Sequence, residues 1–232
     1  MRWKFILGLL TTCAVLMSMS YTMLIPFLPM YLIQDLGVVK ADVDMWSGAI
    51  FAITFLVSGI MAPIWGALAD KKSRKLMALR AGFCLAITYF LGGLVTNPWE
   101  LLGVRFIQGL SAGLWPALLA IISVESPKLK LGFCLGVMQG GMTAGGVLGP
   151  LFGGLLADQF GMRMAFFIAA AALFLITLAL LFFVKEEPRK PDPNAKPVKI
   201  WDFSLCKIPA VKRMLICAGV VQLTILMQQP IM

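Results

Sequence analysis

The sequence contains no histidine and few charged residues. The lack of histidine excludes imidazole metal sites, Ser-His-Asp triads and histidine-based acid–base catalysis. Charged residues make up 13% of the chain, hydrophobic residues make up 60%, and the mean hydropathy is +0.90. An average soluble domain has about 25% charged residues. The composition therefore excludes an ordinary soluble domain and predicts an integral membrane protein.

Signatures of nucleotide hydrolysis and of cysteine chemistry are also missing. The chain has no G-x-x-x-x-G-K-[ST] loop, so we expect no ATP-driven pumping. Its five cysteines are odd in number and widely spaced, and no C-x-x-C pair occurs. We interpret them as small hydrophobic residues within helices. The sequence predicts no enzyme, no cofactor, no metal site and no nucleic-acid partner.

Long apolar runs dominate what is present. A bilayer-spanning helix needs about 20 predominantly apolar residues. Six runs reach this length and a seventh is cut short, at 5–33, 46–69, 76–96, 99–123, 131–157, 162–184 and 213–232. Strands of a membrane barrel would be about ten residues long with alternating polarity, so the predicted fold is all-α and transmembrane. The first run exceeds the apolar core of a signal peptide, so we expect it to be a retained span.

The net charge of +9 is distributed unevenly along the chain. Basic residues are concentrated before the first run and in the second (70–80), fourth and sixth connections, whereas the other connections are slightly acidic. The positive-inside rule then predicts that the N-terminus and the linker are cytoplasmic. The proline-rich linker at 185–212 is expected to be an exposed hinge. It separates a six-helix bundle (1–184) from a partial seventh helix (213–232).

A short repeat supports an organised bundle. The string GALAD at 66–70 ends the second run and GLLAD at 154–158 ends the fifth, an offset of 88 residues and three helices. An arginine follows each copy, Arg74 and Arg163. Because three is odd, the two copies would lie on opposite sides of the membrane. This pattern predicts an inverted three-plus-three repeat, which secondary transporters use for alternating access.

The connection after the second run carries a recognisable string, Gly66-x-Leu68-x-Asp70-Lys71-x-x-Arg74-Lys75. It resembles the signature loop G-x-L-x-D-R-x-G-R-R/K of the major facilitator superfamily, with Ser73 in place of the second glycine. Serine disfavours positive φ, so the turn geometry is expected to differ. The resemblance implies a cytoplasmic gate formed by Gly66 and Lys75 with a charge relay of Asp70, Arg74 and Glu125.

The fourth run contains a second such string, Arg105-Phe106-Ile107-Gln108-Gly109, which is similar to the R-x-x-Q-G of the same superfamily. Arg105 is the only charge well inside a run, and Gln108 follows it on the same helix face. A charge inside a bilayer costs a few kcal/mol or more and is functional by default. The alternative is an arginine near the helix start that reaches the surface. The resemblance implies that Arg105 and Gln108 assist proton coupling.

A glycine-rich face marks the fifth run. Glycine recurs every four residues there, which leaves one face without side chains and lets another backbone approach. Proline within this run lacks the N–H that a helix needs and deforms it. The string resembles the antiporter motif of the drug:proton antiporters in the superfamily. Its residues are Gly141, Gly145, Gly149, Pro150, Gly153 and Gly154.

The proton carrier and the substrate cavity are less well defined. Many such antiporters carry an acidic residue within the first helix, but here Asp35 lies where that helix exits. The carrier is therefore Asp35, a residue of a C-terminal half, or absent. Apolar residues are candidates for a cavity that takes amphipathic cations, although such side chains more often face lipid or a neighbouring helix. The candidates are Met23, Phe27, Trp115, Met138 and Met142.

The resemblance covers residues 5–184 and implies a major facilitator fold. That fold has two six-helix halves, so we expect an N-terminal fragment. The implied function is proton-coupled efflux of amphipathic drugs by alternating access in a bacterial inner membrane. Its partners would be the lipid bilayer, the drug, protons and a missing C-terminal half. The alternatives are a non-transporting remnant, a half-transporter that needs a second half, and a sugar or metabolite porter.

Overall fold

The computed structural model describes residues 2–184 apart from Lys72, together with helical positions 211, 213, 214, 216, 217, 219 and 220. The side chains of Arg2, Asp70 and Lys71 are outside the described set. The chain divides into two units, Met1–Pro193 and Asn194–Met232. The predicted linker at 185–212 and most of the predicted seventh span at 213–232 therefore lie outside the described residues, and they stay predictions.

Every regular element of residues 2–184 is helical, as the apolar runs predict. The α-helices are α1 (Arg2–Met23), α2 (Leu28–Gln34), α3 (Val43–Lys71), α4 (Arg74–Leu94), α5 (Pro98–Leu110), α6 (Leu114–Glu125), α7 (Leu131–Phe160) and α8 (Met162–Phe183). Two 3-10 turns, Lys40–Asp42 and Lys128–Lys130, precede α3 and α7. Together they give six segments that are long and apolar enough to cross a bilayer. The prediction of an all-α, multi-pass membrane bundle is confirmed.

Two of the six predicted spans are interrupted. The first span consists of α1 and α2, with a turn at 24–27 that contains Pro26. The fourth consists of α5 and α6, separated at 111–113, where Gly113 has a φ of +118°. Such a φ strains residues that carry a side chain, so glycine suits this position. Each interruption exposes backbone groups that a continuous helix would satisfy internally.

Two of the helices, α4 and α5, begin at a side-chain cap. Asn97 accepts a hydrogen bond from the backbone of Glu100 at 2.9 Å and begins α5 ahead of Pro98. Ser73 begins α4 in an extended conformation with φ −65°, and its hydroxyl accepts from the backbone of Leu76 at 3.1 Å. A serine cap satisfies one of the free N–H groups of a helix start. The serine that departs from the family signature therefore needs no positive φ here.

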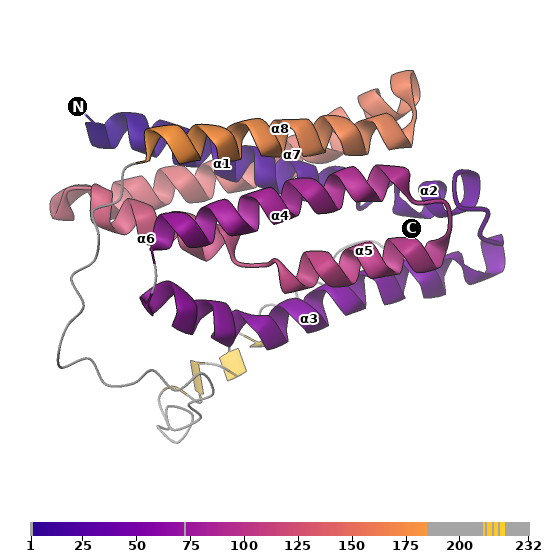
Figure 1. Cartoon of the computed structure of the whole chain (residues 1–232), viewed down its shortest axis with the longest axis horizontal. Helices are drawn as coiled ribbons and strands as arrows, with labels where there is room; N and C mark the ends of the chain where they lie inside the picture. Colours follow the sequence, from indigo (N-terminus) through magenta and orange to yellow (C-terminus); the bar gives the residue numbers. More distant parts are fainter. Residues whose placement is uncertain are drawn as a thin grey trace. The chain divides into compact units, whose positions relative to one another are not determined.

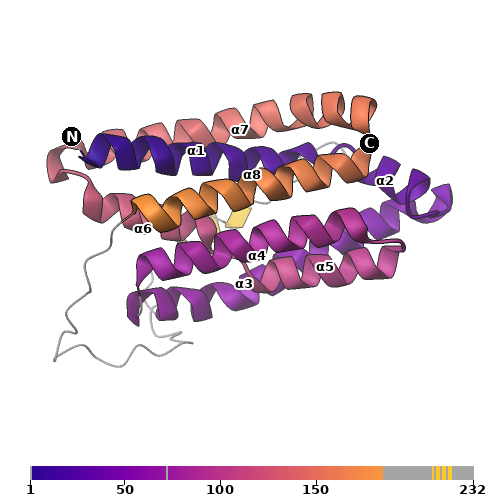
Figure 2. The same ribbon diagram turned by 45° about the horizontal axis from the view of Figure 1, so that its top comes forward.

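The helices pack in pairs, α1 on α7, α3 on α5 and α4 on α8. Figures 1 and 2 both show α4 between α8 and the α3–α5 pair. An inverted repeat exchanges the first three spans with the last three. Under that exchange the pair α1–α7 becomes the pair formed by α5 and α3, and the pair α4–α8 maps onto itself. The pairing is therefore the pattern that the predicted three-plus-three repeat generates.

Two buried apolar clusters fill the bundle, one toward each end. We name the ends by the residues they hold. The basic end contains the start of α1, the α3–α4 connection and the α6–α7 connection, with Lys4, Lys75 and Lys128. The far end contains the α2–α3, α4–α5 and α7–α8 connections, with Asp35 and Arg163. These names carry no assignment of membrane side.

Candidate functional site

The glycine face of α7 receives the backbone of α1. A Cβ atom on Gly145 would collide with the backbone of Val15, and one on Gly149 with the hydroxyl of Thr22. A Cβ atom on Gly153 would lie 2.8 Å from the Met23 carbonyl oxygen. Real Cβ contacts essentially never approach this closely. Only hydrogen fits along this face.

The other members of the predicted string border the same face. A Cβ atom on Gly141 would lie 2.6 Å from the Thr11 side chain, and one on Gly154 would lie 3.2 Å from the ring of Phe27. Pro150 lies inside α7, which continues through it to Phe160. The structure therefore brings the glycine string and α1 together as one tightly packed pair.

Arg105 lies inside the bundle on α5 and is 4% exposed. Its Nη1 donates a hydrogen bond to Oε1 of Gln108 at 3.2 Å, so the two residues share a face as predicted. Its Nη2 has no hydrogen-bond partner in the described part of the chain. An arginine that reaches the membrane surface would expose its guanidinium. The burial argues against the alternative of an arginine that reaches the membrane surface.

Polar groups of three other helices surround this pair. The hydroxyls of Tyr21 on α1 and Tyr89 on α4 are electrostatic neighbours of the guanidinium. The single hydroxyl proton of Thr54 on α3 is shared between the Ile50 carbonyl at 2.9 Å and the Arg105 carbonyl at 3.3 Å. A guanidinium has N–H donors and no acceptor, so the tyrosine oxygens are the groups here that can stabilise its buried charge.

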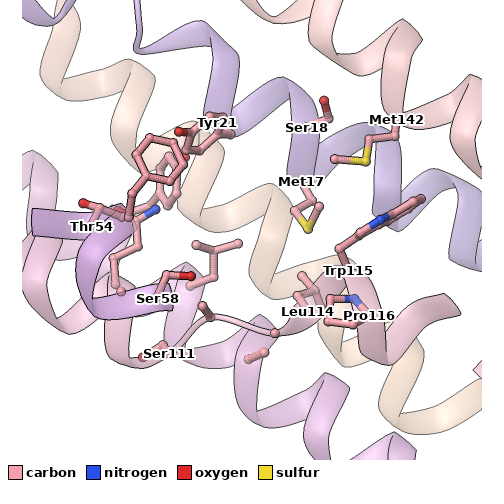
Figure 3. Close-up of a pocket in the computed structure, with 18 residues that line it drawn as sticks. Met17, Ser18, Tyr21, Thr54, Ser58, Ser111, Leu114, Trp115, Pro116 and Met142 are labelled. Carbon is pink, nitrogen blue, oxygen red and sulfur yellow. The ribbon is translucent and has the colours of Figure 1, made fainter. Parts of the chain in front are cut away.

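A cavity of about 240 Å³ opens beside this cluster. Its wall includes both halves of the fourth span and the interruption between them, at 108, 109 and 111–116. In Figure 3, Met17, Met142 and Trp115 gather on one side, and Tyr21, Thr54 and Ser58 on the other. Thioether, aromatic and hydroxyl groups together provide an apolar surface with a few hydrogen-bonding positions, as small-molecule sites commonly do.

The cavity contains two of the five predicted lining residues, Trp115 and Met142. Met138 is fully buried in the core of the basic end, and Met23 packs against α7. Phe27 borders a separate pocket at the far end. The sequence interpretation missed Met17, Ser18, Tyr21, Thr54 and Ser58. The spacing of Met17 and Tyr21 four residues apart was the available signal, because it places both on one helix face.

The described residues of the predicted cytoplasmic gate lie at the basic end. Lys75 donates to the Leu181 carbonyl at 2.6 Å and so joins the start of α4 to the end of α8. Arg74 begins α4, and Glu125 ends α6 half-buried. The side chain of Asp70 lies outside the described residues, so the charge relay stays a prediction. A Cβ atom on Gly66 would meet nothing within 4 Å in the described structure.

Asp35 forms an ion pair at the far end. Its carboxylate oxygen lies 3.3 Å from Nε of Arg163, and the side chains of Asp35 and Arg163 are 26% and 42% exposed. Nη2 of Arg163 donates to the Val95 carbonyl at 3.3 Å. Arg163 therefore joins the end of α2, the α4–α5 connection and the start of α8.

Arg80 differs from the sequence interpretation, which placed it in the second connection. It lies inside α4, half-buried, and its guanidinium stacks on the ring of Trp65 with 3.5 Å to the ring centroid. Arg105 is therefore not the only charge within a span. The sequence pattern offered no signal for this pair, because Trp65 and Arg80 meet only after α3 and α4 have packed.

The sequence model of the Major Facilitator Superfamily matches residues 10–230. The chain is 43% identical over 186 residues to the multidrug resistance protein MdtG of Citrobacter koseri. The aligned residues make up 80% of this chain and 46% of that protein. MdtG of Yersinia enterocolitica is 41% identical over 187 residues, covering 80% and 45%. The chain spans about half the length of these curated relatives.

Solved structures share the fold. A bacterial homolog of the human lysosomal transporter Spinster superposes with a TM-score of 0.70 at 23% identity, covering 89% of this chain and 48% of that chain. The POT family transporter PepTSo superposes with a TM-score of 0.68 at 14% identity, and the match covers 81% of this chain and 40% of that chain. These likenesses support the fold alone. The family match and the MdtG relatives show that the chain belongs to the Major Facilitator Superfamily, a family of membrane transporters and not of enzymes.

Proposed function

We propose that this chain contributes the first half of a proton-coupled exporter of amphipathic drugs that works by alternating access. The observation that carries the proposal is the seating of α1 in the glycine face of α7, at Gly145, Gly149 and Gly153. That face belongs to the string that resembles the motif of drug:proton antiporters. The identity of 41–43% to MdtG multidrug resistance proteins supports the same substrate class.

The cavity beside Arg105 is the proposed half-site for the drug. Its thioether and aromatic groups would contact the apolar part of an amphipathic molecule, and its hydroxyls would bind the polar part. Transporters of this fold bind substrate near the membrane midplane, at the interface of their repeats. The lining supports such a position for the cavity, because α1, α3, α4, α5, α6 and α7 all contribute to it.

The proposed coupling element is the buried pair of Arg105 and Gln108. A fixed positive charge in the membrane lowers the cost of a neighbouring negative charge and opposes proton binding there. Arg105 can act in this way on a carboxylate that enters its surroundings from a facing half. Asp35 is the second candidate for proton binding. Protonation of its carboxyl would remove the ion pair with Arg163 and release the contact between α2 and α8 at the far end.

We further propose that the basic end faces the cytoplasm of a bacterial cell, because it carries the excess of lysine and arginine. On this orientation Asp70, Arg74 and Glu125 would form the charge relay of the cytoplasmic gate, with Lys75 holding α4 to α8 beside it. The far-end ion pair would then face the periplasm.

A half-transporter that needs a second half is favoured over a self-sufficient six-helix protein. The spans built on α3 and α7 are the least enclosed of the six. In the most apolar 18-residue stretch of each, 11% and 17% of the residues are buried in the described structure, against 33–50% in the other four spans. These two spans are exchanged by the inverted repeat. Their open faces are suited to a facing half that would complete the cavity.

Dye efflux from energised cells tests the proposal. The chain would be expressed in a drug-sensitive bacterial strain, alone and together with the C-terminal half of Citrobacter koseri MdtG. We expect export of an amphipathic dye only with the second half present, and loss of export when a protonophore collapses the gradient. Gly149→Val serves as the inactive control. Export that resists the protonophore, or no export in any combination, would contradict the proposal.

A further inference from the structure

The interruption of the fourth span leaves the backbone carbonyls of Leu110 and Ala112, among others, without helical partners. In a continuous helix the Leu110 carbonyl would accept from the N–H of Leu114, and the Ala112 carbonyl from the N–H of residue 116. The helix breaks at 111–113, and residue 116 is proline, which has no N–H. Unsatisfied backbone groups are costly inside a membrane, where no water can replace the missing donor.

Two side chains of neighbouring helices supply the missing donors. Nε1 of Trp65 on α3 donates to the Leu110 carbonyl at 2.8 Å. Nη2 of Arg80 on α4 donates to the Ala112 carbonyl at 2.9 Å. The two donors also contact each other, because the guanidinium carbon of Arg80 lies 3.5 Å from the centroid of the Trp65 ring. A cation over an indole face is the strongest form of cation–π contact.

The interrupted segment is also the wall of the cavity. Residues 111–116 line it without a gap, and they include Trp115. The position of this wall is therefore fixed from behind by Trp65 and Arg80, neither of which lines the cavity itself. Gly113 lies against both side chains, since a Cβ atom there would lie 3.6 Å from Nη2 of Arg80 and 3.9 Å from Cβ of Trp65.

We propose that Arg80 and Trp65 form a clamp that holds the fourth span in its broken shape and so positions the cavity wall at 111–116. Both are positioning residues. The clamp stands on the geometry alone and goes beyond the proposed function, because neither residue belongs to the three strings that resemble the superfamily. Only arginine satisfies both demands, since its planar fork can stack on the indole while one terminal nitrogen donates to a carbonyl. Lysine has no planar group to stack.

Cysteine labelling in membranes tests the clamp. Ser111→Cys would be the reporter in an otherwise cysteine-free chain, because Ser111 lines the cavity and is 9% exposed. We expect Trp65→Phe, Arg80→Lys and Arg80→Gln to raise the rate of maleimide labelling at position 111 by about tenfold, the scale of one lost hydrogen bond. Trp65→Phe is the sharpest variant, because it keeps a ring under Arg80 and removes only the N–H donor.

Two controls separate positioning from general loosening. Trp99→Phe removes a tryptophan at the far end that is 72% exposed, and it should leave the labelling of position 111 unchanged. The fully buried native Cys13, kept as the single cysteine, should stay unlabelled in every clamp variant. Unchanged labelling at position 111 in the clamp variants, or equal gains at Cys13, would overturn the inference. No ligand is used, so a failure of the proposed drug export leaves this test intact.

Discussion

Arg163 and Asp35 meet at the far end of the bundle, with Nε of Arg163 3.3 Å from a carboxylate oxygen of Asp35. The inverted repeat gives this pair a counterpart at the other end. Arg163 follows GLLAD as Arg74 follows GALAD, and Asp35 lies at the end of the first span as Glu125 lies at the end of the fourth. The far-end pair thus occupies the position that corresponds to Arg74 and Glu125 of the predicted relay.

The far-end pair should contribute modestly to stability, because both side chains are partly exposed. We expect Asp35→Asn and Arg163→Gln each to lower the free energy of unfolding, with a coupling energy of about 0.5–1 kcal/mol between them. A double-mutant cycle of unfolding in detergent measures this value. High salt should reduce the coupling. Additive effects of the two substitutions would contradict the observed contact.

The close packing of α1 on α7 should leave no room for a side chain at the glycine positions that contact α1. We expect Gly149→Ala to cost about 1–3 kcal/mol in unfolding free energy, because its new Cβ would collide with the Thr22 hydroxyl and the Met19 carbonyl. Gly140→Ala is the matched control on the same helix, since its Cβ would meet nothing within 4 Å. Thermal unfolding of the purified variants compares the two. Equal changes in the two variants would contradict the close approach; helix propensity alone would make both more stable, because alanine is the better helix former.

Replacing the helix cap Ser73 by alanine and by glycine should lower the stability of the protein by different amounts. Ser73→Ala removes the oxygen that accepts from Leu76 and should cost about 1 kcal/mol, whereas Ser73→Gly should cost only a few tenths. The glycine variant also restores the residue of the superfamily signature. Unfolding midpoints of both variants test the difference. A larger loss for glycine than for alanine would mean that Ser73 acts through something other than its cap.

Much of the bundle could be predicted because its signals are local. Span positions depend on runs of apolar residues, and the shared face of Arg105 and Gln108 depends on helical spacing. The glycines that form the face of α7 likewise lie in one continuous stretch of the sequence. The clamp of Trp65 and Arg80 could not be predicted, because its partners on the fourth span lie in other parts of the sequence. The cavity is made of five spans, and only Trp115 and Met142 were identified in advance.

Proton movement driven by a drug tests the central claim most directly. The chain and the C-terminal half of Citrobacter koseri MdtG would be reconstituted in vesicles that hold a pH gradient and an internal pH dye. We predict that an amphipathic drug accelerates proton flux through these vesicles and that Arg105→Ala abolishes this flux while membrane insertion is unchanged. Lys128→Ala, an exposed residue at the basic end, should keep it. Flux that is indifferent to the drug, or normal flux in Arg105→Ala, would contradict the account.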